Sequence, residues 1–90
     1  MNASENENQA ELKALLWATR RGMLELDVIL TPYLQQEFAQ MTASEIEHFK
    51  AFLGQDDPDL YAWLMGFEAP KPEFAALSGK IRNYIQQQLN

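Results

Sequence analysis

Residues 20–34 read RRGMLELDVILTPYL, and the apolar residues of this stretch recur at the spacing of an α-helix. Leu26, Leu30 and Leu34 follow one another at intervals of four residues, so they share one face of the predicted helix. A glycine precedes them, flanked by arginine and followed by two acids. A helix interior does not favour the glycine, and an apolar core does not favour two guanidinium groups. The stretch therefore predicts a polar turn followed by an amphipathic helix.

Pro32 lies inside this apolar pattern, directly after Thr31. A proline removes a backbone hydrogen bond in the middle of a helix but is well accepted at the first helical position. The sequence leaves two possibilities open: Pro32 kinks one helix, or it begins a second helix that Thr31 caps.

Before the opening stretch, residues 9–19 carry Leu12 and Leu15 at helical spacing and predict a preceding helix. Residues 1–8 are polar and acidic, and we expect a flexible N-terminal tail there. We expect residues 9–90 to form a single helical domain, because so short a chain has apolar surface for only one core.

Two further helices carry start and stop signals. Thr42 and Glu45 form the pattern of a capping box, and Gly54 follows the apolar positions of that helix as a C-cap. Asp57 is expected to cap the next helix, which Gly66 closes. These signals predict two short helices joined by a tight connection.

A last amphipathic helix is predicted from Pro72 onward, and strand signals are scarce along the whole chain. We therefore expect an all-α fold, a small compact bundle of about five helices. Its core is expected to include four of the aromatic residues, namely Trp17, Phe49, Phe52 and Trp63.

Composition limits the classes of partner and of compartment. The net charge is −6, and the seven basic residues are scattered apart from one adjacent pair, so nucleic acid and membrane insertion are not expected. The chain has no cysteine, which excludes disulfides and thiolate metal sites. Its start lacks the basic and apolar regions of a secretory signal, and we expect a cytoplasmic protein.

Residues that could support catalysis or metal binding show no matching pattern. His48 is the only histidine, and no second ligand stands at a metal-binding spacing from it. Asp56, Asp57 and Asp59 suggest a cation site at first sight, but helix capping accounts for them without an ion. The sequence has no nucleotide-binding glycine motif and no nucleophile motif. We therefore expect no metal site and no catalytic residue.

The polar turn around Gly22 allows two interpretations. Gly22 can cap either neighbouring helix, and without a side chain it also lets another surface approach closely. Arg21 and Glu25 can form an exposed ion pair, four residues apart. Arg20 and Asp27 add charges of both signs beside them. From the residues alone, a helical turn and a docking patch fit equally well.

The segment WATRRGMLELDVILTPYLQ, followed by DDPDLYAWLMG, resembles the SdhE (YgfY) or flavinator family. These are small bacterial assembly factors of succinate dehydrogenase, related to mitochondrial succinate dehydrogenase assembly factor 2. The resemblance covers roughly residues 16–67 and rests on an Arg-Gly-x-x-Glu motif at positions 21–25, with the Asp-Pro-Asp-Leu block after it. It implies a five-helix bundle that promotes covalent attachment of FAD to the flavoprotein subunit of succinate dehydrogenase, and to fumarate reductase.

The resemblance also implies which residues bind the partner. The motif glycine and glutamate correspond to Gly22 and Glu25, and Arg21 completes the motif. Arg20 and Asp27 are added because they lie beside it. FAD would be carried by the partner, so the resemblance implies no cofactor of this chain and no enzyme activity. Two alternatives stay open: the antitoxin half of a toxin–antitoxin pair, and an acidic helical adaptor unrelated to flavin.

Overall fold

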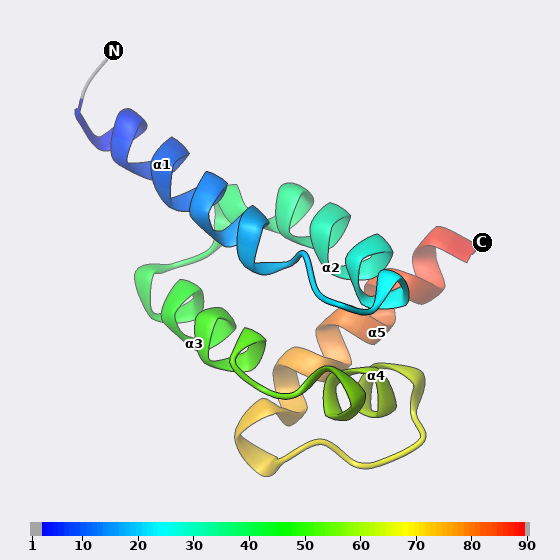
Figure 1. Ribbon diagram of the computed structural model, residues 1–90. Coiled ribbons are helices and arrows are strands. Elements are labelled where there is room, and N and C mark those ends of the chain that lie inside the picture. The colour runs from blue at the N-terminus through cyan, green and yellow to red at the C-terminus, as the bar shows by residue number, and fades with distance from the viewer. Residues whose placement is uncertain (1–2, 90) are drawn as a thin grey trace.

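The computed structural model describes residues 3–89, and the side chains of residues 9–88. Every regular element of this part is helical, so the predicted all-α fold class with five α-helices is confirmed (Figure 1). The elements are α1 Ala3–Ala18, α2 Leu24–Glu37, the short 3-10 helix η1 Phe38–Gln40, α3 Ala43–Leu53, α4 Asp57–Met65, the 3-10 helix η2 Pro72–Phe74 and α5 Ala75–Leu89.

Helix α2 is the centre of the bundle. It runs beside α1 in the opposite direction (Figure 1) and also packs against α4 and α5. Its inner face is the leucine pattern of the opening stretch, and Leu26, Leu30 and Leu34 have no solvent exposure. The helical periodicity therefore identified the residues that bury α2, which stabilise the fold by removing apolar surface from water.

Pro32 does not divide this helix, because α2 is continuous from Leu24 to Glu37. Thr31 accordingly caps nothing, and its hydroxyl lies 2.7 Å from the hydroxyl of Thr19 at the end of α1. Thr19 donates its hydroxyl proton to the carbonyl of Leu16, so Thr31 is the donor within the threonine pair. This buried polar contact joins α1 to α2.

Aromatic rings from α3, α4 and η2 pack together in the core. Phe52 lies 6.2 Å from Trp63 and 5.6 Å from Phe74, measured between ring centroids. Trp17 was also expected in this core, and that prediction is wrong, because 68% of its surface is exposed. The buried face of α1 carries Leu15, and a residue two positions further along a helix points to the opposite side.

Several helix ends follow the sequence signals. Thr42 and Glu45 form both hydrogen bonds of the predicted capping box, at 3.1 and 2.8 Å. Gly66 ends α4 in the left-handed conformation, with φ of 80°, which a residue with a side chain rarely adopts. Asp57 as N-cap is wrong: Asp56 holds that position, and Asp57 is the first residue of α4.

The N-terminal helix is longer than expected. It begins at Ala3 instead of Gln9, so the backbone of residues 3–8 is helical where a tail was predicted. The first two residues of that predicted tail lie outside the described part, and its flexibility stays a prediction. Among residues 3–89, no helix is long and apolar enough to cross a bilayer.

Candidate functional site

The corner between α1 and α2 brings the predicted site residues together. Helix α1 ends at Ala18, and Met23 is the N-cap of α2, without a side-chain hydrogen bond to the helix. The intervening residues turn the chain, and Gly22 caps neither helix. The corner is therefore held by contacts other than helix caps.

Arg21 makes most of these contacts. Its Nε donates to Asp57 Oδ1 at 2.7 Å, and the two side chains are only 18% and 25% exposed. Its Nη1 donates to the carbonyl of Ala18, and its Nη2 donates to the carbonyl of Gln55, both at 3.1 Å. One guanidinium group thus joins the end of α1 to the loop between α3 and α4, using the planar fork of donors that distinguishes arginine from lysine.

Two carboxylates fix the backbone of the corner. The backbone N–H of Arg21 donates to Asp27 Oδ1 at 2.6 Å, so the first turns of α2 reach back to the corner. The N–H of Gly22 donates to Asp57 Oδ2 at 3.2 Å, and the other oxygen of the same carboxylate accepts from Arg21. Asp57 caps no helix because its carboxylate is used here, where a charged donor gives a stronger hydrogen bond than a helix N–H.

Gly22 has no structural need to be glycine. Among the described residues, Gly66 alone has a positive φ, so the backbone at Gly22 suits any residue. An added Cβ at Gly22 would meet Asp57 Oδ2 at 3.8 Å, which is ordinary van der Waals contact. The glycine is exposed, and its missing side chain leaves the backbone of the corner open to another surface.

Exposed side chains lie on both helices that meet at this corner. Leu24 and Val28 lie one helical turn apart on α2 and are 70% and 62% exposed. On the side of α1, the guanidinium of Arg20 lies 5.2 Å above the ring of Trp17. Glu25 is exposed, and within residues 9–88 no hydrogen bond or ion pair involves its carboxylate. We call this set the corner surface: Trp17, Arg20, Gly22, Leu24, Glu25 and Val28.

The structure separates the five predicted site residues into two groups. Arg20, Gly22 and Glu25 face solvent, whereas Arg21 and Asp27 are partly buried and bonded within the chain. The expected pair between Arg21 and Glu25 does not form, because Arg21 is engaged with Asp57. All five residues belong to one corner, but only the first group is presented outward.

Sequence reasoning missed four residues of this corner. Asp57 was assigned to helix capping, and its position 36 residues from Arg21 gave no local signal of their pairing. Trp17, Leu24 and Val28 are large apolar residues on amphipathic helices, and such residues are usually buried. The alternation of exposed Leu24 and Val28 with buried Leu26 and Leu30 was the available signal, since the two pairs lie on different faces.

The corner surface can bind but offers no evident reacting group. It presents an open backbone, a guanidinium, a carboxylate and three exposed apolar side chains. Such a mixture is typical of surfaces that recognise another protein. Within the described residues, no group of histidine, aspartate or glutamate side chains is arranged to hold a metal ion. His48 is exposed and packs its ring 5.2 Å from Phe74.

A protein-family model described as flavinator of succinate dehydrogenase matches residues 13–85 of this chain. This range includes the whole corner surface and Asp57. It excludes all of residues 1–8, for which a tail was predicted.

Relatives with curated names agree with that match. The FAD assembly factor SdhE of Legionella pneumophila (strain Lens) is 44% identical over 73 residues, which are 81% of this chain and 92% of the relative. The protein of the same name from Vibrio cholerae is 55% identical over 58 residues, 63% of this chain and 67% of the relative. A UPF0350 protein solved in solution is 39% identical with a TM-score of 0.70, covering 99% of this chain and 90% of that one.

Proposed function

The chain belongs to the family of succinate dehydrogenase flavinators, and we propose that it is an assembly factor that promotes attachment of FAD to that enzyme's flavoprotein subunit. In this proposal the chain docks through the corner surface and supplies no cofactor. The partner carries both the FAD and the histidine to which the flavin becomes covalently linked. Gly22 is the observation that carries the proposal, because the fold does not require a glycine there.

Different residues of the corner surface would contribute different kinds of contact with the partner. Gly22 gives the partner close access to the backbone, and Leu24 and Val28 provide apolar contact beside it. Arg20 and Glu25 present opposite charges that fix the register of docking more than they add affinity.

Arg21 and Asp27 act mainly from beneath this surface. Their hydrogen bonds to Asp57 and to the corner backbone hold the turn in one conformation. A surface that is ordered before docking loses less conformational entropy when it binds. We therefore extend the partner-binding set by Asp57, as a residue that positions Arg21 and Gly22 for the partner.

The chain would accelerate flavin attachment by orientation. A docked assembly factor that holds a mobile domain of the flavoprotein in place keeps the histidine aligned with the bound flavin. Alignment of two reacting groups lowers the barrier by several kcal/mol without any reacting group from the assembly factor. On this account the chain is not an enzyme, and it acts in the cytoplasm.

The test compares two glycines of the same chain. Gly22→Arg and Gly79→Arg each add one arginine at an exposed glycine, and a Cβ at Gly79 meets nothing within 4 Å. Each variant is co-expressed with the flavoprotein, and covalent flavin is measured by in-gel fluorescence after denaturation. Gly22→Arg should stay folded and lose the signal, whereas Gly79→Arg should keep it. Glu25→Ala should weaken the signal.

Equal labelling by wild type and by all three variants would overturn the proposal. Normal succinate dehydrogenase activity in a deletion strain would favour the adaptor alternative instead, and rescue of a co-expressed toxin would favour the antitoxin alternative. The same co-expression with the fumarate reductase flavoprotein tests whether that enzyme is a second partner.

A further inference from the structure

Four large apolar side chains are exposed within residues 9–88, and three of them belong to the corner surface. Leu24 and Val28 are on α2, Trp17 is near the end of α1, and Phe67 lies elsewhere, after α4. Trp17 has the largest apolar surface of the three corner residues, and it takes no part in the core.

The fold does not explain a tryptophan at position 17. An exposed ring leaves apolar surface in water, and alanine would favour the helical backbone more than tryptophan does. The negative end of the α1 dipole accounts for a positive charge at position 20, but it requires no ring beside that charge. A contact outside the chain is therefore the better explanation of Trp17.

Arg20 has a cation that the chain leaves unpaired. Its guanidinium lies 5.2 Å from the centre of the Trp17 ring. Within residues 9–88 Arg20 has no ion pair, whereas its neighbour Arg21 is paired with Asp57. A ring against one face of a guanidinium leaves the donors along its edge free, and that edge fits both oxygens of a carboxylate. The ring therefore holds the cation in position for an acidic group of a partner.

The backbone that carries Trp17 and Arg20 is fixed from its other side. The N–H of Arg20 donates to the carbonyl of Trp17 at 3.1 Å. Between them Thr19 is fully buried, and its hydroxyl lies 2.7 Å from that of Thr31 on α2. Exposed side chains on an ordered backbone lose less conformational entropy when they bind.

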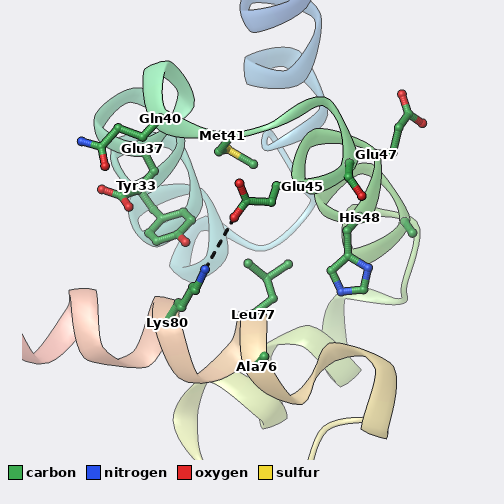
Figure 2. Close-up of a pocket in the computed structure, with 12 residues that line it drawn as sticks. Tyr33, Glu37, Gln40, Met41, Glu45, Glu47, His48, Ala76, Leu77 and Lys80 are labelled. Carbon is green, nitrogen blue, oxygen red and sulfur yellow. Dashed lines mark ion pairs between the residues drawn. The ribbon is translucent and has the colours of Figure 1, made fainter.

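A groove of about 650 Å³ lies between α2, α3 and α5, and two of its carboxylates are compensated within the chain (Figure 2). Glu45 pairs with Lys80 at 3.6 Å. Glu47 pairs with Lys50 at 3.2 Å. The corner, where an exposed ring carries an unpaired cation, is therefore the better candidate for contact with a partner.

We propose that Trp17 is the anchor of docking, an inference that rests on the proposed function. Its ring enters an apolar pocket of the flavoprotein subunit, and Arg20 pairs with a carboxylate at the edge of that pocket. Tryptophan and arginine are enriched among the few residues that contribute most of the binding energy at protein interfaces, and such residues fill pockets that exclude water. The bare backbone at Gly22 lets the partner come close enough to bury the ring.

The main test compares two exposed aromatic residues. Trp17→Ala and Phe67→Ala each remove one exposed ring, and Phe67 lies outside the corner surface. Affinity is measured by calorimetric titration of flavoprotein subunit purified from cells that lack this chain. Trp17→Ala should weaken binding about thirtyfold, and Phe67→Ala should weaken it less than about twofold. Both variants should stay folded, as measured by urea denaturation, because neither ring is in the core.

Equal affinity of Trp17→Ala and wild type would overturn the proposal, as would equal weakening by the two alanine variants. The same titration with Gly22→Arg separates this inference from the proposed function. If Gly22→Arg lost binding while Trp17→Ala kept it, docking through the corner would stand and the anchor would be refuted. If neither variant lost binding, both would be refuted.

A second test asks whether the ring and the guanidinium act together. Arg20→Lys keeps the charge but lacks the planar fork of donors, and it should weaken binding about fivefold. In the double variant Trp17→Ala with Arg20→Lys, the loss should be smaller than the product of the two single losses, because the guanidinium is no longer held without the ring. Single losses that simply multiply would refute the positioning of Arg20 by Trp17.

Burial of the ring can also be observed directly. The chain has two tryptophans, and Trp63 is already buried. With fluorotryptophan in this chain and an unlabelled partner, fluorine NMR reports these two rings alone, and Trp17→Phe assigns the signals. On docking, the Trp17 signal should lose its shift difference between light and heavy water, while the Trp63 signal should show little such difference throughout. A Trp17 signal that stays sensitive to solvent in the complex would overturn the proposal.

Discussion

The start of α3 and the corner before α2 solve the same problem in different ways. Each orders the chain where a helix begins, at the point where the first backbone N–H groups lack partners within the helix. At α3, Thr42 and Glu45 do so reciprocally, three residues apart. At the corner, Asp57 accepts from the guanidinium of Arg21 and from the N–H of Gly22, across 36 and 35 positions, and α2 itself has no side-chain cap. The contacts at the start of α3 are local in the sequence, whereas those at the corner form only when the chain has folded.

The difference explains why the corner can serve recognition. In a capping box the third residue of the helix is glutamate or glutamine, and in α2 that position is the buried Leu26. Glu25 is one residue earlier, so its carboxylate takes no part in a cap and faces solvent. Because the turn is held from below by Asp57, the outward residues are free for a partner.

Removal of the Asp57 carboxylate should have the largest effect on the corner. Asp57→Ala takes away the acceptor of two hydrogen bonds and leaves the partly buried guanidinium of Arg21 without its carboxylate. We expect the free energy of unfolding to fall by about 2 kcal/mol, measured by urea denaturation, and covalent flavin labelling to fall with it. The control is Asp59→Ala, two residues along the same helix, which makes no such contact and should cost less than about 0.5 kcal/mol. Equal losses in both variants would contradict the long-range role of Asp57.

Loss of the local cap should cost less and leave function intact. Thr42→Ala removes the hydroxyl that accepts from the backbone of Glu45. The expected loss in unfolding free energy is about 1 kcal/mol. Covalent flavin labelling should be unchanged, because α3 begins away from the corner surface. If Thr42→Ala lowered covalent flavin labelling while the protein stayed folded, the start of α3 would also contribute to docking, which would contradict this prediction.

A methyl group at the corner should have almost no effect on stability. Gly22→Ala adds a Cβ in ordinary contact with Asp57 and requires no unusual backbone angle. The change in unfolding free energy should stay within about 0.5 kcal/mol in either direction. A loss above about 2 kcal/mol would mean that Gly22 serves the fold, which would remove the main support for its role in docking.

The pH dependence of the local start should give the smallest effect. Hydrogen bonds from Thr42, first from its backbone, lower the pKa of Glu45 below its ordinary value of 4.5. A lowered pKa in the folded state means that the capping box stabilises above pH 4.5 and loses this contribution as the pH falls through the folded pKa. Glu45→Gln should therefore flatten the acid side of the stability profile, measured by thermal unfolding between pH 3 and 7, roughly the range of carboxylate titration. An identical acid profile in the variant would contradict this assignment.

Much of the fold was predictable because its signals are local. The leucines of α2, the capping box at Thr42 and the left-handed Gly66 all depend on residues within about one turn of each other. The resemblance to the flavinator family, carried by positions 21–25 and the block after Gln55, is confirmed by the family model and by the relatives. The prediction that Trp17 is buried was wrong, because this apolar residue lies on the outer face of α1.

The arrangement of the candidate site was less predictable. The sequence brought Arg20, Arg21, Gly22, Glu25 and Asp27 to one turn, but it gave no means to decide which of them face outward. The local rule for ion pairs favoured Arg21 with Glu25, and the folded chain pairs Arg21 with Asp57 instead. Partner binding by these residues stays a prediction until the glycine variants are measured.

Local patterns were enough to predict the helices and most of their ends, because hydrogen bonds and side-chain contacts within four residues are fixed by helix geometry. The motif at positions 21–25 and the block after Gln55 were enough to predict the family. Tertiary structure alone decided that Asp57 holds Arg21 and Gly22, that Pro32 stays within one helix, and that a groove separates α3 from α5. Contacts between residues far apart depend on how whole helices pack, and no local pattern records which side chains that packing brings together.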